Sequence, residues 1–211
     1  MTSPPMSGRK KQAARNDELI LQAARTVFTT DPGAPISAVA DRAGVGISAL
    51  YRRYPSKDAL LQKLCSDGLQ LFLKAAREGL AVDDPWEGFA TFVRGVVAYD
   101  SHSLTIALAG TFPPTEDLFR DSQLAFQLSA EVFERAQQAG VLRPGLVVDD
   151  LAMVFEQLAS IKLGDAERIA ELRERYLTLI LDALRNPPAV SPLPGPPPTA
   201  AEIGQRWVYT G

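Results

Sequence analysis

The side chains best suited to chemistry in this chain gather in a short polar segment near residue 50. Tyr51, Arg52, Arg53 and Lys57 follow one another within seven residues, and each donates hydrogen bonds. Three of them are cations, and a cation in the first turn of a helix favours a phosphate. The segment therefore indicates binding of a phosphate-bearing partner rather than the making or breaking of a bond.

Catalytic patterns are missing from the rest of the sequence. A single histidine, His102, is the only imidazole base, and no nucleophile elbow Gly-X-Ser-X-Gly or glycine-rich phosphate loop occurs. The single cysteine, Cys65, excludes an intrachain disulfide and a cysteine-rich metal site. We expect no enzyme, no cofactor and no metal site.

The polar segment follows a short helix that ends in a glycine turn. Apolar residues at Ile36, Val39, Ala40 and Ala43 have the spacing that places side chains on one helical face. Gly44 follows immediately, and glycine reaches the left-handed conformation common just after a helix without a steric penalty. The sequence predicts two short helices held at a fixed angle.

The second helix of this pair is predicted over residues 47–54, with Leu50 facing inward and Pro55 ending it. Ser56 then serves as the N-cap of a longer helix, and Lys57 lies in its first turn, where backbone amides and a cation favour phosphate. This arrangement is typical of a helix-turn-helix, whose second helix lies in the major groove of DNA.

The surrounding residues are more specific. The run Val39-Ala40-X-X-Ala43-Gly44-Val45-X-X-X-X-Leu50-Tyr51-X-X-Tyr54-Pro55-Ser56-Lys57-X-X-Leu60 resembles the N-terminal domain of the TetR family of bacterial transcriptional regulators. The resemblance covers residues 16–64 at motif level, and Pro35 departs from it where the family has Ser or Thr. It implies phosphate contacts from Tyr51 and Lys57. With the residues that the helix pattern itself places near the groove, the candidate DNA-binding residues are Ser37, Gly46, Ile47, Ser48, Ala49, Tyr51, Arg52, Arg53 and Lys57.

Charge is distributed unevenly along the 211 residues. The formal net charge is −3, but residues 1–63 hold 10 Lys+Arg against 5 Asp+Glu, and residues 64–211 hold 12 against 20. A basic N-terminal part and an acidic remainder suit a DNA-binding head on a body with another role. Residues 1–15, which include Arg9, Lys10, Lys11 and Arg15, are predicted to form a flexible basic arm or a solubilising terminus.

The remaining sequence predicts only helices. They are expected at about residues 16–29, 56–80, 85–100, 104–109, 115–139, 149–163 and 165–185, which with the two motif helices makes about nine. The predicted fold is all-α, with an N-terminal three-helix helix-turn-helix DNA-binding domain at 16–63 and a C-terminal helical ligand-binding and dimerisation domain at 64–186. No run of about 18 apolar residues and no secretory signal is visible, so we expect a cytoplasmic location and no membrane partner.

The resemblance implies a small-molecule cavity in the C-terminal domain. Its candidate lining residues are Trp86, Phe89, Phe92, Tyr99, His102, Phe112, Phe119, Phe126 and Met153. Aromatic residues at helical spacing are also typical of an ordinary core, so this alternative stays open for each of them.

The last two predicted helices carry wide apolar stripes that fit a twofold dimer interface. Its candidate residues are Leu151, Phe155, Leu158, Ile161, Leu172, Tyr176, Ile180 and Leu184. The same stripes could instead close a monomeric core.

The C-terminal tail, residues 187–211, differs from the rest. Residues 187–201 contain seven of the 16 prolines, which predicts neither helix nor strand there. Beyond them, Trp207 and Tyr209 form an aromatic pair that could dock on the body or on a partner.

Together these patterns predict a homodimeric DNA-binding transcriptional regulator, a repressor that binds a palindromic operator and responds to a small-molecule effector. The alternative is a helical ligand-binding or interaction protein that has lost DNA binding.

Overall fold

The structure, a computed structural model, describes residues 8–186, 191–205 and 208, and its regular elements there are all helices. The helices are α1 (Gly8–Thr30), α2 (Ile36–Ala43), α3 (Ile47–Arg53), α4 (Lys57–Leu80), α5 (Pro85–Ala98), α6 (Ser101–Leu108), α7 (Glu116–Gln138), α8 (Asp150–Ala159), α9 (Ala166–Leu184) and α10 (Ala200–Gln205). The predicted all-α fold is confirmed, with ten helices in the described residues where about nine were expected.

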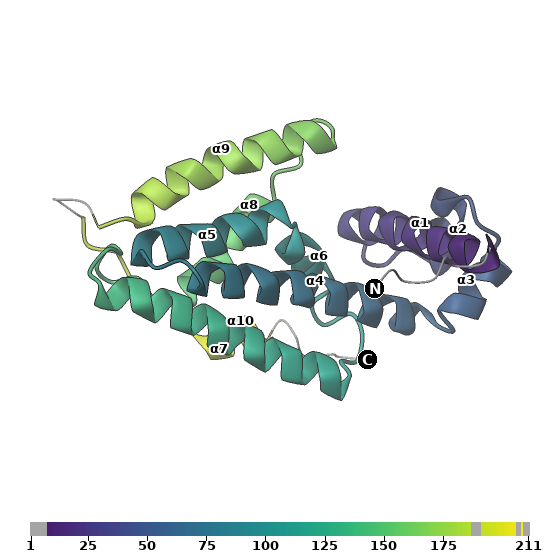
Figure 1. The fold of residues 1–211 in the computed structure, drawn as a ribbon, viewed down its shortest axis with the longest axis horizontal. Coiled ribbons are helices and arrows are strands. Elements are labelled where there is room, and N and C mark those ends of the chain that lie inside the picture. Colours follow the sequence, from purple (N-terminus) through teal and green to yellow (C-terminus); the bar gives the residue numbers. More distant parts are fainter. Residues whose placement is uncertain (1–7, 187–190, 206–207, 209–211) are drawn as a thin grey trace, which may run out of the picture. The chain divides into compact units, whose positions relative to one another are not determined.

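The chain divides into two compact units, residues 1–64 and 65–211. Figure 1 follows the chain through both units, and α4 is the helix that contains the division. Its first eight residues belong to the first unit and the rest to the second. One unbroken helix is therefore the covalent connection between the two.

In the first unit, α1 packs along α2 and helps to bury the centre of the helix-turn-helix. Ala24 and Phe28 of α1 are fully buried, as are Val39 of α2 and Leu50 of α3. Helix α1 begins at Gly8, so residues 8–15 are helical in the structure, in contrast to the flexible arm expected from their charge. Residues 1–7 of that predicted arm lie outside the described residues.

The turn between α2 and α3 has the conformation predicted from its glycine. Gly44 has φ 64° and ψ 32°, the left-handed region, and its N–H donates to the last turn of α2. The N–H of Val45 also donates to the carbonyl of Ala40, at 3.1 Å. These bonds satisfy carbonyls that α2 leaves unpaired at its end, and they fix the direction in which α3 leaves.

The second unit is organised around α5, which contacts α6, α7 and α9 (Figure 1). Asp84 caps its start by accepting a hydrogen bond from the N–H of Glu87 at 2.8 Å, and Pro85 occupies the first turn, where a missing N–H costs nothing. Phe89, Phe92 and Val93 of α5 are fully buried. An apolar helix with neighbours on several sides accounts for the core of this unit.

The end of α4 packs closely on the start of α5. A Cβ atom added at Gly79 would lie 2.6 Å from the carbonyl oxygen of Gly88, and one at Gly88 would lie 2.7 Å from that of Gly79. Arg135 of α7 donates to the carbonyls of Leu80, at 3.0 Å, and Val82. The two glycines permit the approach of the helices, and the guanidinium satisfies the carbonyls at the end of α4.

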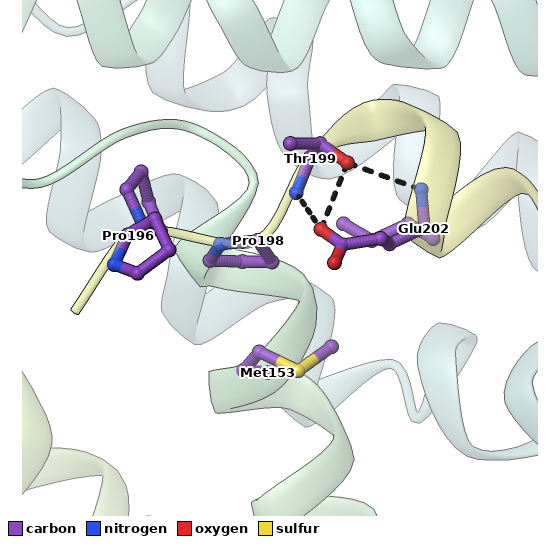
Figure 2. A pocket seen from close by; sticks show the side chains of 7 residues that line it. Met153, Pro196, Pro198, Thr199 and Glu202 are labelled. Carbon is purple, nitrogen blue, oxygen red and sulfur yellow. Dashed lines mark hydrogen bonds between the residues drawn. The ribbon is translucent and has the colours of Figure 1, made fainter.

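The proline-rich tail includes a helix that its composition did not predict. Thr199 and Glu202 exchange hydrogen bonds at the start of α10: the N–H of Thr199 donates to Glu202 Oε2 at 2.8 Å, and the N–H of Glu202 donates to Thr199 Oγ1 at 3.2 Å (Figure 2). This reciprocal pair is a capping box, which stabilises a helix start. The predicted aromatic pair, Trp207 and Tyr209, lies outside the described residues.

Among the residues that the structure describes, none of the helices combines the length and apolar character needed to cross a bilayer.

Candidate functional site

The helix-turn-helix presents an exposed surface made by the start of α2, the turn and α3. Ile47 and Tyr51, at i and i+4 on α3, have 40% and 45% of their surface exposed although both are large and apolar. The predicted DNA-binding residues at 37, 46, 48, 52 and 53 are also exposed, and Ala49 is half-buried. Most of the predicted DNA-binding residues are therefore accessible in the first unit.

Arg53 is held by α1 rather than left free. Its Nε and Nη2 donate to Asp17 Oδ1 and Oδ2 at 2.7 and 2.9 Å, and the hydroxyl of Tyr54 donates to the same Oδ1 at 2.7 Å. The hydrogen bond from Arg53 holds the pKa of the Asp17 carboxyl below its usual range. Burial and the bond to Asp17 raise the pKa of Tyr54. Arg53 thus connects the end of α3 to α1. Its place in the motif did not indicate this role.

Lys57 is also engaged within the first unit. Its Nζ donates to the carbonyl of Pro32 at 3.0 Å and lies 5.2 Å from the ring centroid of Phe28. Ser56 caps α4, since its Oγ accepts from the N–H of Ala59 at 3.1 Å. An ammonium has three donors, so one bond to a carbonyl leaves donors for a phosphate at the same helix start.

The second unit contains a cavity of about 370 Å³. Its apolar wall comes from α4, α6 and α8, and Ile203 of α10 also lines it. Phe72 of α4 and Phe155 of α8 meet there edge to face, with ring centroids 6.4 Å apart. The lining residues are Leu69, Phe72, Ser101, His102, Thr105, Ile106, Ala109, Ala152, Phe155, Glu156 and Ile203.

Three polar side chains of α6 contribute to this wall, and each bonds to a backbone carbonyl. Ser101 Oγ donates to Val96 O at 3.2 Å, and Thr105 Oγ1 donates to Ser101 O at 2.8 Å. His102 Nδ1 lies 3.3 Å from the same Val96 O. His102 is 5% exposed, and burial lowers the pKa of its imidazole.

A second cavity, of about 280 Å³, lies under the tail. Met153 of α8 and the tail residues Pro196, Pro198, Thr199 and Glu202 line it (Figure 2). Ile203 lines both cavities, so α10 covers part of each.

The predicted ligand contacts separate into several groups. His102 lines the larger cavity and Met153 the smaller one. Tyr99 is half-buried and donates to Glu78 Oε2 at 2.9 Å. Phe119 and Phe126 lie on the outside of α7, with 60% and 53% of their surface exposed. The buried remainder, Trp86, Phe89, Phe92 and Phe112, does not line either cavity.

Most of the residues predicted for the dimer interface are buried in the core of their own chain. Leu151, Phe155, Leu158, Leu172 and Leu184 are each less than 9% exposed within one chain, so their own core covers them. Phe155 lines the cavity instead. These five side chains are therefore not available as surface contacts.

Another apolar stripe remains exposed on α9. Tyr176 and Leu179 are 47% and 56% exposed, and Leu163, just before the helix, is 71% exposed. Tyr176 belongs to the predicted set, and two other members of that set, Ile161 and Ile180, are half-buried.

Arg173 connects α9 to the turn that precedes the polar part of the cavity. Its Nε donates to the carbonyl of Leu158 at 3.1 Å, and its Nη1 lies 2.7 Å from Asp100 Oδ1. Asp100 has φ 47°, a left-handed conformation uncommon for a residue with a side chain. No sequence pattern singled out Arg173, because its partners are 15 and 73 positions away in the chain.

Comparisons with known proteins agree with these observations. The family model for bacterial regulatory proteins of the tetR family matches residues 20–64, and the model for the SbtR-like transcriptional regulator C-terminal domain matches residues 84–186. A TetR transcription regulatory protein from Mycobacterium vanbaalenii is 30% identical over 83% of this chain and 98% of its own, with a TM-score of 0.50. The chain belongs to the TetR family.

Other TetR-family structures are also similar. SCO0520 from Streptomyces coelicolor is 26% identical over 82% of this chain and 99% of its own, with a TM-score of 0.52. LfrR from Mycobacterium smegmatis, solved in complex with proflavine, is 21% identical over 85% of this chain and 99% of its own, with a TM-score of 0.57. None of the curated protein sequences matches the chain significantly. As a TetR-family protein the chain is a DNA-binding transcriptional regulator and not an enzyme.

Proposed function

We propose that this TetR-family protein is a repressor that binds a palindromic operator as a homodimer and releases it when a small molecule occupies the 370 Å³ cavity. The observation that carries the proposal is the presence, in one chain, of an exposed helix-turn-helix surface and a separate apolar cavity. Helix α4 contributes to both, with Lys57 at its start and Leu69 and Phe72 in the cavity wall.

Operator binding would use α3 in the major groove. Ile47 and Ala49 are suited to contact thymine methyl groups, and Tyr51 and Lys57 are suited to contact phosphates. Because Arg53 is bonded to Asp17, we assign it the positioning of α3 ahead of base contact.

Dimerisation would use the exposed stripe of α9 rather than the buried residues beneath it. Tyr176 and Leu179 are three positions apart and Ile180 adjoins them, so they share one side of the helix. A twofold interface buries the same surface on both copies, and a twofold dimer matches two half-sites separated by whole helical turns of DNA.

The effector would act through different affinities for two states of the protein. A cavity of this size lies within the range of small-molecule sites, about 300–1,000 Å³. The complex of LfrR with proflavine gives one example of a similar fold holding an aromatic compound. Coupling between effector and operator in such systems is typically about 1–3 kcal/mol, which corresponds to a change in DNA affinity of roughly 5–150-fold.

A footprinting experiment tests the proposal. Purified protein is expected to protect two half-sites, related by a twofold axis, in the DNA that flanks its own coding region. An added effector is expected to remove the protection. If no fragment of that region is protected at low salt, the protein is instead a helical ligand-binding or interaction protein that has lost DNA binding.

A further inference from the structure

The polar side chains of the larger cavity offer hydrogen-bond acceptors rather than donors, because their hydrogen atoms are already donated to backbone carbonyls. Ser101 and Thr105 each have one hydroxyl hydrogen, and each donates it to a backbone carbonyl, Val96 O and Ser101 O respectively. The hydroxyl oxygens keep their lone pairs, so toward any further partner they can only accept.

His102 adds one more acceptor to this side of the cavity. Its Nδ1 faces Val96 O, which can only accept, so the hydrogen of a neutral imidazole belongs on Nδ1 and Nε2 carries the lone pair. His102 is 95% buried by its own chain, and Nε2 has no hydrogen-bond partner among the described residues. A buried acceptor without a partner is costly, and a ligand that supplies a donor removes that cost.

The remaining lining residues do not supply strong hydrogen-bond donors. Glu156 of α8 adds a carboxylate, which accepts when ionised, and the other lining side chains are apolar. No lysine or arginine is among the described residues that line this cavity. The wall thus offers several acceptors and an apolar surface that includes Phe72 and Phe155.

We propose that this cavity selects apolar molecules that carry an N–H or O–H group, donated to His102 Nε2 and to the hydroxyl oxygens of Ser101 and Thr105. It discriminates against molecules of the same shape whose polar groups only accept, carboxylates included. This inference rests on the proposed function, in which the cavity holds the effector.

Three probes with one ring skeleton test the selection: 2-naphthol, which donates an O–H; 2-methoxynaphthalene, in which a methyl group replaces that hydrogen; and 2-naphthoate, which carries only acceptors. Their dissociation constants for the full-length protein are measured by calorimetry at neutral pH without DNA. We expect 2-naphthol to bind roughly tenfold tighter than its methyl ether, the scale of one hydrogen bond to a buried group, and 2-naphthoate to bind most weakly.

Variants identify the groups responsible. His102→Phe keeps a ring beside Phe155 but removes Nε2, so the preference for 2-naphthol over its ether should fall to about twofold or less. Thr105→Val keeps the shape of the side chain and removes one acceptor, so it should also reduce the preference. It serves as the test if His102→Phe does not fold. Thr178→Val is the matched control, because Thr178 makes the same hydroxyl bond to the carbonyl four residues earlier on an exposed part of α9. It should keep the full preference.

Several results would overturn the selection: equal or tighter binding of the ether or of 2-naphthoate, no binding of 2-naphthol up to its solubility limit, or an unchanged preference in both cavity variants. Operator affinity, measured in parallel, separates this inference from the proposed function. If 2-naphthol binds with the expected preference but leaves operator affinity unchanged, the selection stands and the effector role fails. If another compound releases the operator while the donor preference is missing, the effector role stands and the selection fails.

Discussion

The guanidinium of Arg53 and the carboxylate of Asp17 form a two-pronged ion pair, with Nε–Oδ1 and Nη2–Oδ2 distances of 2.7 and 2.9 Å. Arg53 is the last residue of α3, and Asp17 lies in the middle of α1. Tyr54, which is 5% exposed, donates to the same carboxylate. The orientation of α3 therefore depends on a residue outside the helix-turn-helix itself.

Replacing Asp17 by Ala should lower both the stability of the first unit and its affinity for DNA. The expected loss in free energy of unfolding is about 1–2 kcal/mol, because the Tyr54 hydroxyl loses its partner while the Arg53 side chain, 58% exposed, is partly screened by water. Urea unfolding measures the change. Asp117→Ala is the control, since its pair with Arg120 is exposed on both sides, and an equal loss in the two variants would contradict the bracing role.

The contribution of Asp17 should depend on pH in a defined direction. The pKa of its carboxyl is lowered in the folded state, chiefly by the hydrogen bond from Arg53, so the ionised form stabilises the fold. The difference in unfolding free energy between wild type and Asp17→Ala should be constant well above pH 3.8, the ordinary value, and should shrink as the pH falls below it. Urea titrations from pH 7 to 3 follow this difference. A difference that grows toward acid pH would show that the ion pair is not its source.

Tyr51 and Lys57 should differ in how they affect DNA binding and stability. Tyr51→Phe removes only an exposed hydroxyl, so operator affinity should fall while the melting temperature stays unchanged. Lys57→Ala should reduce the slope of log affinity against log salt by about 0.9, the value for one phosphate contact. It should also destabilise the protein slightly, because the bond to Pro32 is lost.

Filter binding at several salt concentrations gives these slopes. Arg94→Ala, which removes one exposed cation from the second unit, is the control and should leave the slope unchanged. A slope equal to wild type in Lys57→Ala would exclude the phosphate contact.

Gly88→Ala should destabilise the second unit. The added methyl group would meet the carbonyl of Gly79 at 2.7 Å and the guanidinium of Arg135, so the helices must move apart. Overpacking of this kind typically costs about 1–3 kcal/mol. Gly204→Ala on α10, where a Cβ meets nothing within 4 Å, is the control. Its free energy of unfolding, measured by thermal unfolding, should lie within about 0.5 kcal/mol of the wild-type value.

The exposed stripe of α9 should control the oligomeric state. Changing both Tyr176 and Leu179 to Glu places charges on a surface that a partner would have to desolvate, and sedimentation is expected to show a monomer at micromolar concentration. Thr178→Glu, on the same helix but away from the stripe, should leave the dimer intact. A wild-type protein that sediments as a stable monomer would reject the interface.

Local patterns in the sequence predicted where most helices lie, and they predicted helix ends where a capping residue or a glycine sets the end; α1 begins eight residues before its expected start, and α8 ends four residues before its expected end. Helix α2 begins at Ile36 and ends before Gly44 as expected, and Asp84 with Pro85 starts α5. Helix α10 was missed because the prolines dominated the composition, although Thr199 and Glu202 have the spacing of a capping box.

The cavity was harder to anticipate, since it depends on which apolar side chains pack against one another. Phe89, Phe92 and Phe155 all belong to the core around α5, yet only Phe155, with Phe72 packed beside that core, also forms part of the cavity wall. All four lie on apolar helix faces, and periodicity does not separate a wall from a core. The bond between Arg53 and Asp17, 36 positions apart, is likewise invisible to local patterns.

The contacts at the C-terminal end of α4 give that helix unequal freedom along its length. Its final carbonyls are bonded to Arg135, and Gly79 is fitted against Gly88, so this end is held against α5 and α7. A molecule that occupies the cavity would touch this helix at Leu69 and Phe72, before the end that Arg135 and Gly88 fix in place.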